Sequence, residues 1–350
     1  GGRGRVAGTG GRCGRGEDSV TLAIFHKLLA IFFTVALGWV AGRRRWLGGP
    51  GGIGPAARAL SDAAFYLFVP ALLFRTMARL DFAALPWRTL AAYYVPVLVY
   101  VLAVYGWHRR AAARAEAPGD APAAPATRAI AATYGNGVQL GIPMAAALFG
   151  EPGLALHIAL VSLHGLVLLT LLTTLVEVDL ARADRGATLA ATVRTTARNA
   201  LLHPVTLPVL AGLAWNLTGL GLHPVVDETL GALGLAVVPV CLVLIGLTLA
   251  QYGLRGHVRG ALTTAALKLL VLPALVLAVA SLGFGLSGLP LAVLVMMAAL
   301  PVGSNALIFA QRYDTLQAQA TTAIVFSTLV FAATATLWLG VLAWLGRHGG

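Results

Sequence analysis

The sequence is poor in charged residues and in cysteine. Charged residues make up 11% of its 350 residues, and Cys13 and Cys241 are the only cysteines. Because one lies in a Gly- and Arg-rich head and the other in an apolar segment, they support neither a disulfide framework nor a cysteine metal site. The sequence has no His-Glu-x-x-His motif, no clustered carboxylates and no phosphate-binding loop. We therefore expect a protein that is not an enzyme and that holds no cofactor or metal.

Apolar residues are in excess. Hydrophobic residues make up 58% of the chain, and the mean hydropathy is +0.83. No globular domain could cover so much apolar surface, so the composition indicates an all-α, multi-pass membrane protein. A spanning helix needs about 20 mostly apolar residues. Ten segments qualify: 21–41, 57–79, 86–107, 128–149, 153–178, 196–217, 228–250, 260–282, 288–311 and 318–345.

The net charge of +12 is concentrated in alternate short loops, which argues against a nucleic-acid partner. The loops after the odd-numbered spans hold Arg43, Arg44, Arg45 and Arg58; Arg109, Arg110, Arg114 and Arg128; Arg182, Arg185, Arg194 and Arg198; Arg255 and Arg259; and Arg312. By the positive-inside rule these loops are cytoplasmic and both termini are external. The basic head at 1–20 breaks this pattern, and we expect it to be disordered.

The second half of the chain repeats features of the first. Pro70 and Pro239 lie in similar apolar segments, and Pro143 and Pro301 lie in similar interrupted segments, at corresponding places in the two halves. Five spans followed by five similar spans place the second set upside down, as in many secondary transporters. The expected organisation is a disordered head (1–20), a first five-helix repeat (21–178), a cytoplasmic linker (179–195) and an inverted second repeat (196–345).

Two spans carry matching interruptions, at Tyr134–Gly150 and at Ala298–Tyr313. Proline lacks an amide hydrogen and clashes with the carbonyl four residues earlier, so Pro143 and Pro301 each free a backbone carbonyl. Irregular backbone at membrane depth survives only inside protein or beside a wet cavity. The pair of interruptions therefore predicts a polar cavity near the midplane, formed by two broken helices. The alternative is a pair of ordinary proline kinks.

The residues that carry these features resemble the auxin efflux carrier family. The resemblance rests on Leu28–Arg45, Leu60–Ala78, the run Asn136-Gly-Val-Gln-Leu-Gly-Ile-Pro143, and Ala299–Tyr313. It implies ten transmembrane helices as two inverted five-helix repeats, with the fourth and ninth helices crossing at their prolines. Spans one, two, six and seven would form a scaffold and the others a moving transport domain. The large cytosolic loop of the plant members is missing, which favours a bacterial malonate-type permease.

An anionic substrate suits the chemistry of the predicted crossing. A proline in the first turn of a half-helix leaves the following amides, from Met144 onward, without intrahelical partners at a positive dipole end. Side-chain amides and a hydroxyl flank both breaks, although Asn305 could equally be a structural cap. The expected substrate-binding residues are Asn136, Gln139, Gly141, Pro143, Met144, Pro301, Ser304 and Asn305.

Ionisable residues inside spans are functional candidates by default. Lys268 could balance the substrate charge, or its side chain could extend to the membrane interface. His157 and His164 share one helix face and could relay protons, or could simply pack between helices. Asp227, at the start of the seventh span, is expected to stabilise a helix N-terminus.

The sequence thus predicts a secondary transporter, a permease or efflux carrier, that moves a small organic anion by elevator-type alternating access. The alternative is a membrane-embedded receptor or scaffold without transport. The expected location is the cell membrane, in a bacterium the inner membrane. Expected partners are the organic anion, the lipid bilayer and a second copy bound through the scaffold helices, with no nucleic acid.

The arginine-rich loops make the orientation testable. A membrane-impermeant thiol reagent added outside intact cells should not label cysteines introduced at Gly48 or Gly256, because both lie in loops expected in the cytoplasm. Labelling at either position would reverse the proposed orientation.

Overall fold

The computed structural model describes residues 29–47, 52–114, 121–183 and 206–348, without 31, 82, 84 and 253–257 and with 194, 198, 201, 202 and 204 in addition. Residues 1–20, expected to form a disordered head, and most of the expected 179–195 linker lie outside this part. Residues 179–183 of that linker belong to a helix. The described backbone is helical and forms no strand, in agreement with the predicted all-α class.

By length and composition, six helices in the described part could cross a membrane: Ile53–Ala78, Trp87–Arg114, Met144–Arg182, Pro224–Gln251, Val258–Gly283 and Gln317–Arg347. Three shorter apolar helices span Phe32–Arg43, Thr206–Leu217 and Gly288–Ala299. The segment that contains Met144–Arg182 bends at Gly150, whose φ of 61° lies in the left-handed region that glycine tolerates.

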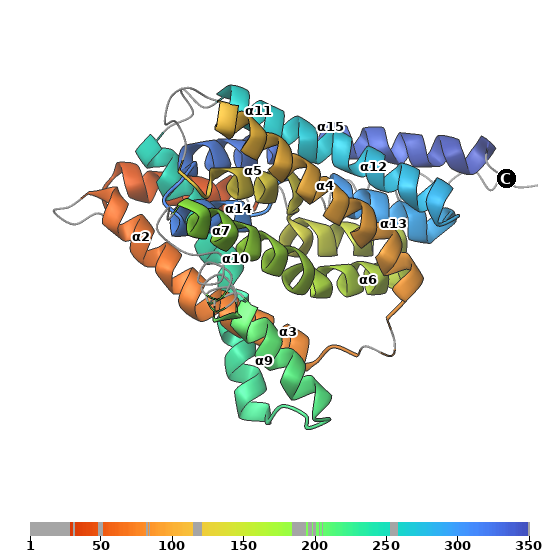
Figure 1. Cartoon of the computed structure of the whole chain (residues 1–350), viewed down its shortest axis with the longest axis horizontal. Helices are drawn as coiled ribbons and strands as arrows, with labels where there is room; N and C mark the ends of the chain where they lie inside the picture. The colour runs from red at the N-terminus through yellow and green to blue at the C-terminus, as the bar shows by residue number, and fades with distance from the viewer. Residues whose placement is uncertain are drawn as a thin grey trace, which may run out of the picture.

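The elements follow one another along the chain with π-helical turns (η) inside several helices. They are α2 (Ile53–Ala63), η1 (Ala64–Phe68), α3 (Val69–Ala78), α4 (Trp87–Arg114), α5 (Ala124–Thr133), η2 (Gly137–Gly141), α6 (Ile142–His164), η3 (Gly165–Leu169), α7 (Thr170–Ala183), α9 (Thr206–Leu217), α10 (Pro224–Tyr252), α11 (Val258–Ala266), η4 (Leu267–Val271), α12 (Leu272–Ala278), η5 (Val279–Gly283), α13 (Gly288–Ala299), α14 (Asn305–Arg312) and α15 (Gln317–His348). In Figure 1, α3 and α9 lie side by side at the bottom, while α4, α12, α13 and α15 lie at the upper right.

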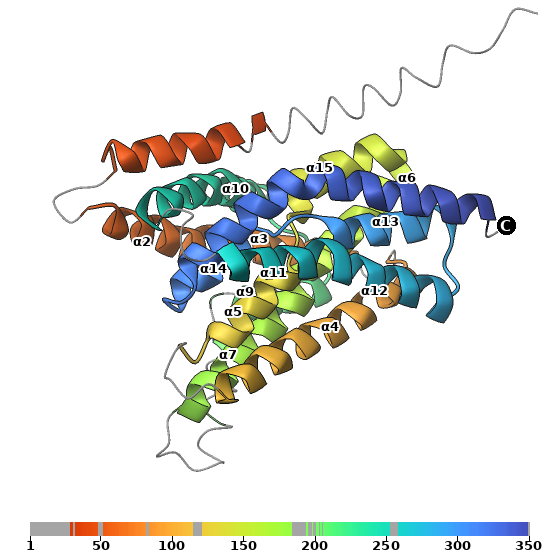
Figure 2. The ribbon, with the colours of Figure 1, turned by 90° about the horizontal axis from the view of Figure 1, so that it is seen from above.

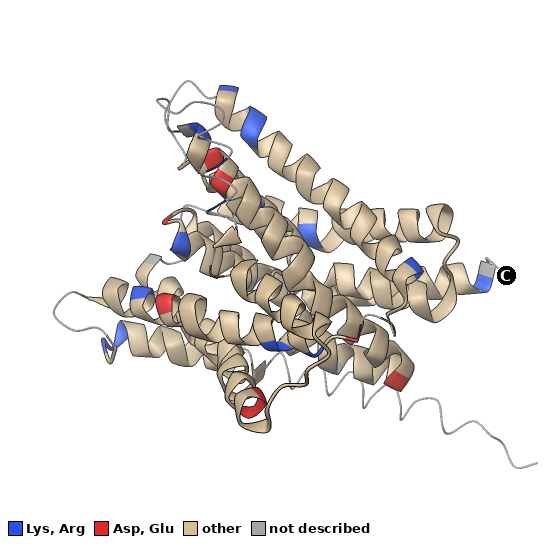
Figure 3. Cartoon of the chain, turned by 60° about the horizontal axis from the view of Figure 1, so that its bottom comes forward, with Lys and Arg blue, Asp and Glu red and all other residues tan. Residues whose placement is uncertain are grey.

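Many of the packing contacts fall within two groups of helices, although α10 also packs against α15, and α2 against α14. The helices α2 and α3 pack against α10, and α3 also packs against α9; in the other group α4 packs against α5 and α12, and α13 against α12 and α15. Figure 2 shows α12, α13 and α15 running beside one another. The end of α13, from Val293 to Ala299, is completely enclosed. Figure 3 shows that most charged residues lie near the ends of helices, as a lipid-facing surface requires.

Three prolines follow π-helical turns without ending their helices. Pro70, Pro143 and Pro273 each lie in the first turn of an α-helix that directly follows η1, η2 and η4, respectively. A widened turn leaves room for a residue that has no amide hydrogen and crowds the preceding carbonyl. The prediction that Pro143 breaks the fourth span is therefore wrong. The break lies earlier, at Tyr134–Asn136, between α5 and η2.

The two breaks pair with each other. Between α13 and α14 the chain is non-helical from Leu300 to Ser304, so Pro301 lies within its break as expected. Gly135 and Val302 form an antiparallel bridge. The amide of Asn136 donates to the Pro301 carbonyl (2.9 Å), and the Gly303 amide donates to the Tyr134 carbonyl (2.8 Å). Much of the polar backbone that the two breaks release is thus satisfied across the crossing.

This close pairing makes Gly303 sensitive to substitution. A β-carbon at Gly303 would lie 2.9 Å from the carbonyl oxygen of Gly135, which is backbone and cannot rotate away. We expect Gly303→Ala to destabilise the protein by about 1–3 kcal/mol, as overpacking does elsewhere. The control is Gly106→Ala in α4, where the nearest atom is the tip of Arg110 at 3.9 Å. Thermal unfolding in detergent should show a lower melting temperature for Gly303→Ala only; equal values would mean that the bridge yields.

Candidate functional site

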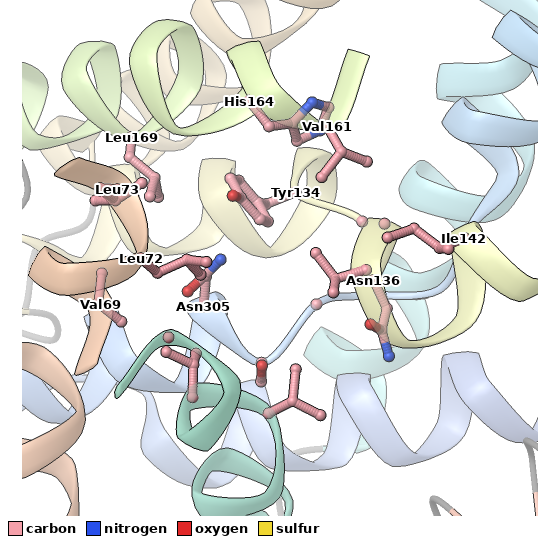
Figure 4. A pocket seen from close by; sticks show the side chains of 18 of the residues that line it. Val69, Leu72, Leu73, Tyr134, Asn136, Ile142, Val161, His164, Leu169 and Asn305 are labelled. Atoms are coloured by element: carbon pink, nitrogen blue, oxygen red, sulfur yellow. The ribbon is translucent and has the colours of Figure 1, made fainter. Parts of the chain in front are cut away.

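A cavity of about 530 Å³ opens between α3, α10 and the paired breaks. Figure 4 shows Leu72 and Leu73 on one side of it and Tyr134 and Asn136 on the other. Its lining consists of Val69, Leu72, Leu73, Arg75, Tyr134, Gly135, Asn136, Gly137, Val138, Ile142, Val161, His164, Leu169, Leu230, Gly231, Gly234, Leu235, Val237, Val238, Met297, Gly303, Ser304 and Asn305. The wall is mostly apolar with a few polar groups, as in many small-molecule sites.

The polar groups of the crossing converge on this cavity. Asn136, Ser304 and Asn305, three of the predicted binding residues, line it. The Asn305 side chain lies within hydrogen-bonding reach of the Tyr134 hydroxyl, and Figure 4 shows the two close together. The side-chain amide of Asn136 has no hydrogen-bond partner among the described residues, although its backbone is fixed at both ends by the Pro301 carbonyl and the Gly141 amide.

Two helix N-termini meet at the same place. Gly137 and Val138 begin the helix after the first break, Asn305 begins α14 with Ser304 directly before it, and all four line the cavity. The N-terminal end of a helix carries a partial positive charge, so such ends attract anions. Some of the first amides are already used here, because Gly137 donates to the Gly135 carbonyl and Ala306 and Leu307 donate to the carbonyls of Gly303 and Ser304. The sequence analysis predicted the first of these helix ends at Met144, because it assigned the break to Pro143. The helix begins earlier, at Gly137.

The other predicted binding residues lie elsewhere or cannot be placed. Gly141 is buried, and a β-carbon there would lie 2.5 Å from His157 Nε2, so its role is close packing. Met144 is 2% exposed and is not among the residues that line the cavity. The backbone of Pro301 belongs to the bridge. The side chains of Gln139 and Pro143 lie outside the described part of the structure.

Lys268 occupies neither of its two predicted environments. Its side chain is fully buried, so it does not extend to the membrane interface, and it does not line the cavity. The ammonium group donates a hydrogen bond to the Ala298 carbonyl at the C-terminal end of α13, 2.5 Å away. None of the ion pairs among the described residues includes it. Lys268 is thus a cationic cap on the negative end of a half-helix.

The two histidines have different surroundings. His157 is buried, and its Nε2 lies 2.8 Å from the Gly137 carbonyl, beside the first break. His164 lines the cavity, and its Nδ1 lies 3.2 Å from the Tyr94 hydroxyl, which itself donates to the Leu160 carbonyl. Because the hydroxyl proton is used, Nδ1 of His164 is assigned as the donor, and in the neutral ring Nε2 then keeps a lone pair. This Nε2 has no partner among the described residues.

Sequence reasoning overlooked two features of the cavity. Arg75 lies inside the second predicted span, and the rule that flags ionisable residues within spans could have singled it out. Gly231 and Gly234 on α10 leave space beside α3, since β-carbons there would lie 3.3 Å from Arg75 and Leu72, respectively. These glycines have no local sequence signal, because their importance depends on which helix faces them.

Comparison with known protein families shows which family the chain resembles. A family model described as "Membrane transport protein" matches residues 23–339, which is most of the chain. No curated protein matches the sequence.

The buried ammonium leads to a prediction in which stability and activity move in opposite directions. Burying an ion costs several kcal/mol, whereas a hydrogen bond to a charged group returns only about 1.5–3 kcal/mol. Methionine fills nearly the same volume as lysine, so we expect Lys268→Met to have an equal or higher melting temperature. We also expect it to transport more slowly, and a gain in stability with a loss of activity is typical of functional residues. A lower melting temperature for Lys268→Met would make Lys268 a stabilising cap only.

Proposed function

The chain belongs to the membrane transport protein family, the auxin efflux carriers that its motifs resemble, and on that premise we propose that it is a secondary carrier for a small organic anion. As a member it is a multi-pass membrane transporter. The observation that carries the anion proposal is the convergence of two half-helix N-termini and the Asn136 amide on one cavity. Helix N-termini and a side-chain amide can bind a carboxylate without a lysine in the binding site.

Alternating access of the elevator type fits the two groups of helices. The cavity lies between α3 and α10 of one group and the paired breaks of the other. A movement of the breaks past α3 and α10 would carry the bound anion across the membrane. We infer that α2, α3, α9 and α10 belong to the scaffold and that the bridged breaks move with α4, α5 and α11–α15.

Intervals along the chain support the inverted repeat once the breaks are matched by structure. Gly135 and Val302 face each other, and the interval between them in the sequence is nearly the same as that between Pro70 and Pro239. His157 lies within hydrogen-bonding distance of the Gly137 carbonyl beside the first break, and Ser327 accepts a hydrogen bond from the Val302 amide in the second break. Almost the same interval in the sequence separates these two residues. The interval between Pro143 and Pro301 is clearly shorter, because Pro143 lies beyond its break.

The ammonium of Lys268 bears on ion coupling. In many secondary transporters the C-terminal ends of half-helices and unwound carbonyls hold a sodium ion. Here Lys268 already provides a cation at the end of α13. We therefore expect uptake to proceed equally well when choline replaces sodium.

Asn136 provides the sharpest test of the binding site. A hydrogen bond to a charged group contributes roughly 1.5–3 kcal/mol, so Asn136→Ala should weaken anion binding by about ten- to a hundredfold. Asn136→Asp should bind more weakly still, because it opposes a negative charge with another in a cavity with a mostly apolar wall. Folding should change little, since the side-chain amide has no partner among the described residues.

The measurement is uptake of radiolabelled acetate, malonate, succinate and indole-3-acetate into proteoliposomes. Ser281→Ala is the control, because its hydroxyl bonds within its own helix, to the Leu277 carbonyl, away from the cavity. Uptake of an anion that Asn136→Asp leaves intact would place the carboxylate elsewhere. If the parent protein moves none of the four anions, the proposal of an organic-anion substrate is wrong.

A further inference from the structure

Arg75 is the one residue with a formal charge among the described residues that line the cavity, and nothing in the proposed function uses it. It lies on α3, one turn after Leu72, which faces the same space. A guanidinium is always charged and presents its donors in a fixed fork that suits carboxylates. Its presence on an otherwise apolar wall therefore needs an explanation.

Arg75 is held by a carboxylate on the facing helix. Its Nε donates to Asp227 Oδ1 (2.9 Å) and to the Asp227 carbonyl (3.1 Å), and its Nη2 donates to Oδ2 (3.0 Å). Arg79 binds the same carboxylate through Nη1, at 2.9 and 3.2 Å. Asp227 was expected only to stabilise a helix N-terminus; it does lie in the first turn of α10, and it also joins two arginines. The three side chains together carry a net charge of +1.

The hydrogen bonds leave part of the Arg75 guanidinium unused. Among the described residues, no hydrogen bond involves its Nη1. Gly231 of α10 lies against the same group, and a β-carbon there would be 3.3 Å from Cζ and 3.6 Å from Nη2. The glycine thus keeps the space beside the guanidinium open. Asp227 fixes the position of Arg75 without occupying all of its donors.

Arg75 and Arg79 share a partner but differ in location. Arg79 is more exposed than Arg75, 56% against 34% of the side chain, and it does not line the cavity. Joining α3 to α10 would explain the contacts of both arginines with Asp227, but it does not explain why only Arg75 lines the cavity. The cavity position of Arg75 distinguishes it.

We propose that Arg75 is a specificity-determining residue that selects anions at the scaffold wall of the cavity, with Asp227 holding its guanidinium toward that space. The identity of the selected anion as a transported substrate rests on the proposed function, whereas the charge selectivity of the cavity does not. The positive charge of Arg75 raises the local concentration of anions in the cavity and the rate at which they enter it. Arg75 lies on α3, whereas the Asn136 amide lies at the breaks. It is not part of the site that moves.

The test measures charge selectivity without a substrate. Leu72→Cys, in a protein whose Cys13 and Cys241 are replaced by alanine, places a thiol in the cavity one turn from Arg75. The purified protein in detergent is treated with two reagents that differ in charge, anionic methanethiosulfonate ethylsulfonate and cationic methanethiosulfonate ethyltrimethylammonium. Comparison with the rates for a free thiol removes the intrinsic difference between the reagents.

We expect the anionic reagent to react faster, and Arg75→Gln to lower the anionic-to-cationic rate ratio by roughly tenfold, as loss of a nearby unit charge in a poorly solvated cavity predicts. Arg75→Lys should restore most of the ratio, and Arg79→Gln, which removes a more exposed charge outside the cavity, should lower it clearly less than Arg75→Gln does. The proposal is overturned if Arg75→Gln leaves the ratio intact, or if Arg79→Gln lowers it equally. Failure of uptake by the parent protein would count against the transport function alone.

Discussion

Hydrogen bonding of the backbone is the constraint on which this structure depends. Where a helix is interrupted at membrane depth, lipid offers no partner for the freed amides and carbonyls. Here each interruption supplies partners for the other, through the bridge between Gly135 and Val302 and the bonds on either side of it. Ser327 satisfies the Val302 amide, and Lys268 satisfies the Ala298 carbonyl. The cavity exists because these interruptions lie together, and the lining side chains adjust its chemistry.

Sequence reasoning predicted the features that depend on local chemistry. Hydropathy indicated a helical membrane protein because lipid permits few other folds, and the family resemblance agreed with the family match. Pro301 lies within a break, and Asn136, Ser304 and Asn305 line the cavity, since amide and proline residues at membrane depth have few other uses. The inverted repeat and the moving domain stay predictions.

The errors concern features that depend on three-dimensional neighbours. Pro143 was assigned a break because proline removes a hydrogen bond, but the π-helical turn η2 absorbs that loss and the break lies at Tyr134–Asn136 instead. Lys268 could not be placed from its spacing, because its partner is a carbonyl 30 residues away in sequence. Arg75 could have been singled out as an ionisable residue inside a predicted span, but its pairing with Asp227, 152 residues later, could not.

The bridge between the breaks has a consequence for how selectivity can evolve. It fixes the spacing between the helix end at Gly137 and the one at Asn305. In the proposed binding mode, the polar head of a bound molecule would therefore meet the same geometry whatever its tail. The remaining wall, from α3 and α10, is mostly apolar apart from Arg75, with side chains such as Leu72 and Val238, and in the proposed binding mode it would contact the tail. Substitutions on those two helices could therefore exchange one tail for another while the recognition of the head, and the folding of the crossing, stay as they are.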